Sequence, residues 1–209
     1  MRNPIILFVV LCIAAILFTT FHQNILDLKA LEIQSLSKSI SQKQIDKFIT
    51  SSQSKEYLNY IFVPINIITK VTIIALFLFF GCFLVDLKVK FKQILTFCIK
   101  AEFIFLLPVL YEIIYFKFIQ TNHTYSDIQN FSSLSVLNAI GYKNVENWFF
   151  YPLQTLNLFE LIYWLVLACY IGKITETNSK RGLLIVASSY GSALLLWVTV
   201  TMFLTLNYS

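Results

Sequence analysis

Five long apolar stretches constrain this chain more than any other feature of its sequence. Each is free of charged residues, or nearly so, over roughly the 17–25 residues that an α-helix needs to cross the hydrocarbon core of a bilayer. Helices satisfy their backbone hydrogen bonds internally, which a spanning segment must do. We therefore predict an all-α bundle of five transmembrane helices, forming a single membrane domain over residues 1–209. The five stretches are Ile5–Phe21, Ile61–Val85, Ile94–Phe118, Leu153–Gly172 and Leu183–Leu206.

The composition excludes a soluble or disordered chain. Hydrophobic residues make up 57% of the sequence and charged residues 13%, against roughly 45–50% and about 25% in soluble domains. Disorder requires the opposite balance, with low hydrophobicity and high charge. The net charge of +5 does not predict nucleic-acid binding, because the basic residues cluster beside apolar stretches, where they orient membrane helices.

The first stretch has two interpretations. Arg2 followed by an apolar core is typical of a signal peptide. Residues Thr19–Gln23 lack the small-residue pattern of a cleavage site, and no small residue precedes Cys12 as in a lipoprotein. We therefore expect an uncleaved membrane anchor.

The basic residues predict the orientation of the bundle. Two short connections are rich in them, with Lys88, Lys90 and Lys92 in one and Lys173, Lys180 and Arg181 in the other. Such connections stay in the cytoplasm, and Arg2 places the N-terminus there as well. We predict a multi-pass protein of the bacterial cytoplasmic (inner) membrane, with the N-terminus inside and the C-terminus outside. The segments 22–60 and 119–152 then face outward. Apolar residues at helical spacing in the first of them predict a small extracytoplasmic helical cap.

Three charged residues inside the predicted spans lie at one depth. Lys70, Glu112 and Glu160 each lie roughly 9–14 Å below the outer surface, counted at 1.5 Å per residue from the outer end of each span. Ionisable side chains at this depth are paired or functional. Two interpretations remain open: a structural ion pair of Lys70 with one of the glutamates, or a polar cavity for a cation, an amine or a proton. Lys100 and Glu102 are expected to reach toward the cytoplasmic side.

Small residues along the last span predict a helix-contact face, because they let membrane helices approach closely. The residues are Gly182, Ser188, Gly191 and Ser192. The contact is either within the bundle or with a partner.

The sequence lacks the motifs of several common enzyme sites. It has no HExxH helix, no phosphate-binding loop of the GxxxxGK[ST] type and no GxSxG elbow. The cysteines lie far apart in apolar stretches, so we expect buried hydrophobes rather than metal ligands. They are Cys12, Cys82, Cys98 and Cys169. We expect no catalytic residue, no metal and no cofactor.

Several motifs in the C-terminal half resemble one membrane protein family. They are Phe131–Ser135, Leu156–Trp164, Gly172–Thr175 and Ser179–Gly182. Together they resemble bacterial Yip1-like proteins over about residues 60–206, although Ser133 stands where the family has a proline. The resemblance implies five spans and a non-enzymatic role. Eukaryotic members are membrane-trafficking adaptors, and bacterial members are described as transporter subunits.

Two functions remain open. The first is a non-enzymatic accessory or scaffold subunit of a bacterial transport or export complex, whose partners are the lipid bilayer and other membrane proteins. The alternative is a small permease or proton-coupled channel that uses Lys70, Glu112 and Glu160.

Overall fold

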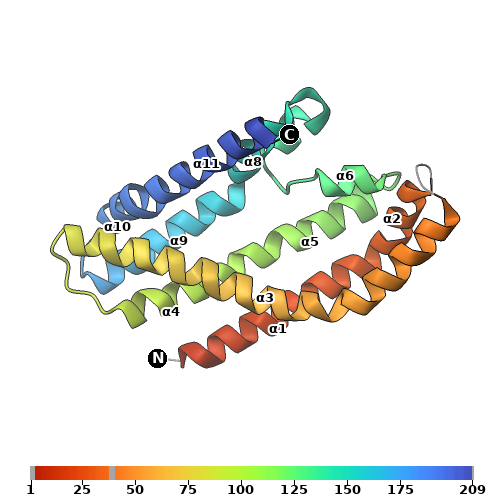
Figure 1. The fold of residues 1–209 in the computed structure, drawn as a ribbon. Helices are drawn as coiled ribbons and strands as arrows, with labels where there is room; N and C mark the ends of the chain where they lie inside the picture. Colours follow the sequence, from red (N-terminus) through yellow and green to blue (C-terminus); the bar gives the residue numbers. More distant parts are fainter. Residues whose placement is uncertain (1–2, 38–40, 209) are drawn as a thin grey trace.

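The computed structural model describes residues 3–37 and 41–208, and its regular elements there are helices (Figure 1). This confirms the all-α prediction. Four helical stretches are long and apolar enough to cross a membrane, and they overlap the first, second, third and fifth predicted spans. They are Pro4–Ile25, Tyr60–Leu84, Phe91–Ile119 and Ser179–Tyr208.

The N-terminal half begins with α1 (Pro4–Ile25), a short helix α2 (Leu28–Leu36) and the long helix α3 (Gln42–Leu84). The residues expected outside the membrane before Tyr60 are therefore largely helical, and those from Gln42 onward continue directly into the second span. A helix of 43 residues is about 65 Å long, whereas the hydrocarbon core is about 30 Å thick. A large part of α3 therefore extends beyond its apolar half.

The third span is a rod built from four pieces. These are α4 (Phe91–Glu102), the 3₁₀-helix η1 (Phe103–Leu106), α5 (Leu107–Ile114) and the π-helix η2 (Tyr115–Ile119). Pro108 lies in the first turn of α5. Proline has no backbone N–H to donate to the preceding turn, so the switch to 3₁₀ geometry falls where α-helical hydrogen bonds are interrupted.

Short helices form the second of the two segments that are predicted to face outward. They are α6 (Tyr125–Gln129), α7 (Val136–Ile140), the 3₁₀-helix η3 (Tyr142–Asn144) and α8 (Asn147–Thr155). The backbone N–H of Val136 donates to the carbonyl of Leu156 at 3.0 Å, and that of Leu158 donates to the carbonyl of Leu134 at 3.2 Å. These hydrogen bonds fold the segment back on the corner between α8 and α9.

The fourth predicted span, 153–172, is not one helix. Helix α8 ends at Thr155, and α9 (Leu158–Ile174) begins after an extended Asn157 whose side chain caps it. Hydropathy does not register this corner, because apolar residues lie on both sides of it. The chain then ends in α10 (Ser179–Val186), the π-helix η4 (Ala187–Gly191) and α11 (Ser192–Tyr208).

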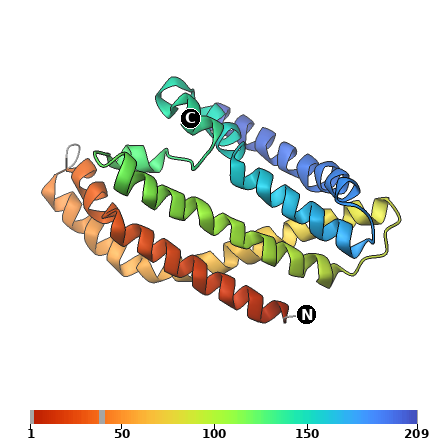
Figure 2. The same cartoon turned by 180° about the vertical axis from the view of Figure 1, so that it is seen from behind.

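The main core lies where α3, α4, α9 and α10 meet. It is built around fully buried Val71, Leu78, Ile94, Leu167 and Val186. Figures 1 and 2 show the N-terminus, the α3–α4 turn and the α9–α10 turn toward one end of the molecule. The C-terminus, α2 and α6 lie toward the other end. Arg2, on which the predicted orientation partly rests, lies outside the described residues.

Candidate functional site

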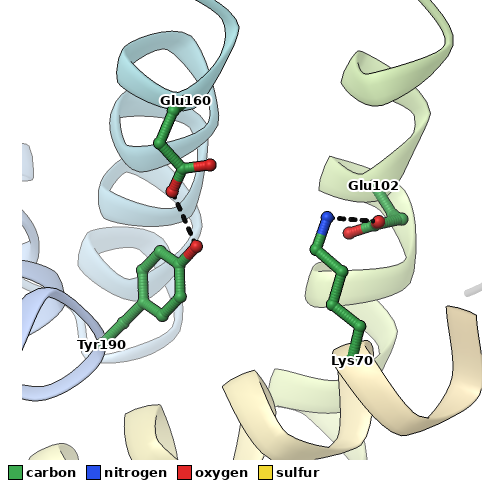
Figure 3. A network of polar contacts seen from close by, with 4 residues as sticks. All are labelled: Lys70, Glu102, Glu160 and Tyr190. Atoms are coloured by element: carbon green, nitrogen blue, oxygen red, sulfur yellow. Dashed lines mark hydrogen bonds and ion pairs between the residues drawn. The ribbon is translucent and has the colours of Figure 1, made fainter. Parts of the chain in front are cut away.

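Lys70 on α3 and Glu102 at the end of α4 form an ion pair inside the bundle (Figure 3). Lys70 Nζ lies 2.7 Å from Glu102 Oε1 and 3.5 Å from the centroid of the Phe105 ring. The side chain of Glu102 is 7% exposed, whereas that of Lys70 is 41% exposed. A buried carboxylate is costly without a partner. The pair therefore fixes α3 against α4 at this level.

Glu160 lies in the first turn of α9 and joins that helix to η4. Asn157 Oδ1 accepts a hydrogen bond from the backbone N–H of Glu160 at 2.8 Å, and the positive end of the helix dipole favours a carboxylate here. Tyr190 Oη donates to Glu160 Oε1 at 2.6 Å (Figure 3), and Trp164 Nε1 donates to the same oxygen at 2.9 Å. The hydrogen bond from Tyr190 thus holds η4 against α9, whereas that from Trp164 lies within α9.

The structure does not bring Lys70, Glu112 and Glu160 into contact, which corrects the pairing expected from the sequence. Glu112 Oε1 on α5 instead lies 3.2 Å from Nε2 of His22 on α1. The sequence-based depths of Lys70, Glu112 and Glu160 were counted from the predicted outer end of each span. For Lys70 this reference point is wrong, because α3 continues as a helix beyond that end to Gln42. Counted from the short α3–α4 turn, Lys70 lies about 21 Å and Glu102 about 17 Å along their helices. The two therefore face each other in mid-bundle. Glu102 does not reach toward the end of the bundle that holds the α3–α4 turn, contrary to the expectation from the sequence.

Tyr163 on α9 lies between these two polar contacts. Its side chain is completely buried, and its ring lies 5.9 Å from the ring of Tyr190 and 5.0 Å from that of Phe105. The ammonium of Lys70 lies 5.8 Å from its ring centroid. Among the described residues, neither the Tyr163 hydroxyl nor Glu102 Oε2 has a hydrogen-bond partner. Such buried polar atoms are usually satisfied by ordered water.

Glu102, Tyr163, Tyr190 and His22 were not predicted as site residues. Glu102 carried a usable signal, because it is an acid within a predicted span. Tyr163 was placed by its position in the chain near the level of the charged residues, but Tyr190 carried no signal, because only packing shows which aromatic side chain meets a carboxylate.

The predicted helix-contact face divides into two parts. A Cβ atom at Gly182 would meet the carbonyl oxygen of Ala168 on α9, and one at Gly191 would lie 2.6 Å from the Trp164 ring. Both glycines therefore lie in contacts within the bundle. Ser188 and Ser192 are exposed, and their hydroxyls donate to backbone carbonyls of their own helix.

Ser189, next to the exposed Ser188, makes a close helix contact that the sequence analysis did not identify. A Cβ atom at Gly81 on α3 would lie 2.6 Å from Cβ of Ser189. Five residues lie in the π-helix η4. Its wider turn shifts the residues that face the bundle by one position relative to a regular α-helix.

Asp127 organises the segment around α6, which lies outside the four long apolar helices. The backbone N–H and the hydroxyl of Thr124, the N-cap of α6, donate to Asp127 Oδ2 at 2.9 and 2.7 Å. Tyr142 Oη donates to Oδ1 at 2.9 Å. These hydrogen bonds, with those from Thr124 the strongest, hold the pKa of Asp127 below its usual value of 3.8.

The described residues include no group of three His, Cys, Asp or Glu side chains placed to hold a metal ion. Comparison of the chain with protein-family models, curated proteins and solved structures finds no match. The candidate site is therefore defined by the ion pair, the Glu160 contacts and the buried Tyr163 alone.

Proposed function

We propose that this protein is a non-enzymatic accessory or scaffold subunit of a transport or export complex in a bacterial cytoplasmic membrane. The observation that carries the proposal is that Glu102 and Glu160, two carboxylates at the level of the spans, both have firm partners inside the chain. Lys70 forms an ion pair with Glu102. Glu160 accepts hydrogen bonds from Tyr190 and Trp164, and the third carboxylate, Glu112, lies 3.2 Å from His22 Nε2. Charges used in this way hold helices in place and leave the outer surfaces for partners.

The proposed topology has five crossings, with the N-terminus inside and the C-terminus outside. Supporting it, the two turns at one end of the molecule (Figures 1 and 2) carry six basic side chains against two acidic ones over residues 85–92 and 173–181. The 17 residues of α9 span about 26 Å, close to the roughly 30 Å of the hydrocarbon core. The interfacial Trp148 and Tyr151 of α8 would anchor its outer end.

The proposed partners are the lipid bilayer and other membrane proteins. Two helices at the periphery of the bundle offer large apolar surfaces for them. Helix α1 exposes Ile5 and Leu17, and α11 exposes Leu195 and Phe203. The resemblance to bacterial Yip1-like proteins points to the same non-enzymatic class and remains part of the proposal.

The test is site-specific photo-crosslinking in cells, combined with the native mass in mild detergent. A photoreactive residue at Leu195 on α11 is compared with one at Ile13 on α1, both exposed. If the protein is an accessory subunit, one of the two positions should crosslink to a single other membrane protein in stoichiometric amount. The native mass of the particle should then equal the sum of this chain and that partner. A monomer or a homo-oligomer with no such crosslink from either face would contradict the proposal.

A small permease or proton-coupled channel is a second candidate. The observation in its favour is that, among the described residues, three buried polar atoms lack a hydrogen-bond partner: the Tyr163 hydroxyl, Glu102 Oε2 and His22 Nε2. Waters bound to the first two would form part of a proton path. Proteoliposomes that carry the chain would then dissipate a pH gradient. Glu102→Gln, Glu112→Gln and Glu160→Gln separate the possible routes. Leakage equal to that of protein-free liposomes would rule out this candidate.

A further inference from the structure

A lateral cavity of about 560 Å³ opens beside the first turn of α9. The segment before α7 forms one wall, held by its backbone hydrogen bonds to the α8–α9 corner. Ser133 Oγ also donates to the carbonyl of Pro108 at 2.8 Å, which fixes this wall to the third span. The cavity falls within the roughly 300–1,000 Å³ range of small-molecule sites.

The walls of the cavity are mainly apolar and include Leu134, Leu156, Leu161 and Leu194. Leu156 and Leu161 are each 60% exposed, so the opening lies on a surface of the same character as the hydrocarbon of a bilayer. Among the described residues that line the cavity, Glu160 is the one with a charged side chain. An occupant must therefore be largely apolar and must satisfy one carboxylate.

The wall of the cavity formed by the first turn of α9 carries a net negative charge when the Glu160 carboxylate is ionised. The N-terminus of α9 contributes roughly +0.5 of an elementary charge, which is smaller than the full charge of the carboxylate. Both side-chain donors of the protein bind Glu160 Oε1, and Figure 3 shows the second oxygen turned away from Tyr190. Trp164 also lines the cavity, and the face of an indole ring attracts cations.

We propose that this cavity binds lipophilic cations, compact apolar molecules that carry one delocalised or amine-type positive charge. Glu160 and Trp164 would recognise the charge, and the leucine side chains would enclose the apolar body. The proposal goes beyond the accessory role and does not depend on it.

The test compares two probes of nearly the same size and shape and of opposite charge, tetraphenylphosphonium and tetraphenylborate. Equilibrium dialysis measures their binding to the full chain in nanodiscs of zwitterionic phospholipid, with empty nanodiscs subtracted. We expect saturable, one-to-one binding of the cation and at least tenfold weaker saturable binding of the anion. Absence of saturable cation binding, or equal binding of both ions, would overturn the proposal. Equal binding would identify a purely apolar groove for lipid chains.

Two variants locate the site. Glu160→Gln keeps an oxygen that accepts from Tyr190 and Trp164, so the fold is retained, and it should weaken cation binding at least tenfold. Its matched control is Glu146→Gln. Glu146 also accepts a tryptophan N–H, from Trp148 at 2.7 Å, but it does not line the cavity, so cation binding should not change. Ala139→Leu, which narrows the cavity from α7, should weaken cation binding as well. Unchanged cation binding in Glu160→Gln or in Ala139→Leu would overturn the proposal.

Discussion

The Lys70–Glu102 pair should behave as a unit, so that losing one member costs more than losing both. Lys70→Met leaves a carboxylate whose side chain is only 7% exposed without its partner. Removing one member of a buried pair costs several kcal/mol, and because Lys70 is 41% exposed we expect the free energy of unfolding to fall by about 2 kcal/mol. Unfolding by SDS titration in micelles measures this loss.

The control for that prediction is the double variant Lys70→Met with Glu102→Met, which replaces the pair by apolar side chains. It should recover at least half of the loss, because no buried charge remains unpaired. The single variant Glu102→Met completes the comparison. If the loss in the double variant equals the sum of the losses in Lys70→Met and Glu102→Met, the two residues do not interact.

Asp127 gives the segment around α6 a defined response to acid. Because its pKa is lowered in the folded state, the carboxylate contributes stability that is fully present above its unfolded pKa near 3.8. That contribution is lost as the pH falls through the lower folded-state pKa. A carboxyl NMR titration in micelles should give a midpoint below 3.8, and Thr124→Ala should raise it. Thr175→Ala, whose hydroxyl bonds to Ile171 O at 2.8 Å in the distant turn, should leave the midpoint unchanged. A midpoint at or above 3.8 in the unmodified protein would contradict the geometry.

At the scale of elements, the close approach of α9 and α10 depends on a residue without a side chain. Gly182→Ala places a methyl group against the carbonyl oxygen of Ala168 and 3.0 Å from the backbone nitrogen of Gly172. Backbone atoms cannot rotate away, so we expect a loss of about 2 kcal/mol in the free energy of unfolding. Ser188→Ala, at an exposed position in the same run of small residues, should change it by less than about 0.5 kcal/mol. If Gly182→Ala and Ser188→Ala lower the free energy of unfolding equally, then α9 and α10 move apart at Gly182 at little cost.

The elements also show what the sequence can and cannot predict. Hydropathy located four apolar helices, because burial in hydrocarbon requires apolar side chains over a fixed length. It did not locate the helix ends. Helix α3 extends to Gln42 because backbone hydrogen bonding continues through polar residues. The chain turns at Asn157 because this residue caps α9, and neither feature changes the hydropathy profile.

The candidate site was predictable in residue type but not in pairing. Charges within spans are costly, which singled out Lys70 and Glu160. Which side chains meet depends on the axial offset and rotation of neighbouring helices. For Lys70 the offset is set by the short α3–α4 turn, and for Tyr190 the rotation is set by the π-helix η4.

At the scale of the whole molecule, the proposed topology predicts the side of the membrane from which each turn is accessible. Single cysteines at Lys88 and Lys180 test one end of the bundle, and cysteines at Lys143 and Asn207 test the other. All four positions are exposed. Each cysteine is introduced into a protein that also carries Cys169→Ala. Cys169 is exposed and would itself be labelled, whereas the other three cysteines are buried. An impermeant maleimide added to intact cells should label Lys143→Cys and Asn207→Cys, and should label the other two only after permeabilisation.

The accessibility of Lys143→Cys compared with that of Lys180→Cys shows whether α9 crosses the bilayer, because α8 and α9 are the helices that separate the two positions. Opposite accessibility of the two requires α9 to span, which its length of 17 residues allows only if the bilayer thins slightly or polar residues at its ends extend to the interface. Equal accessibility would leave four crossings. The C-terminus would then lie on the same side as the N-terminus, and Asn207→Cys would react together with Lys88→Cys. In that case the six basic residues at the two turns would lie on different sides of the membrane, and the argument from their shared charge would fail.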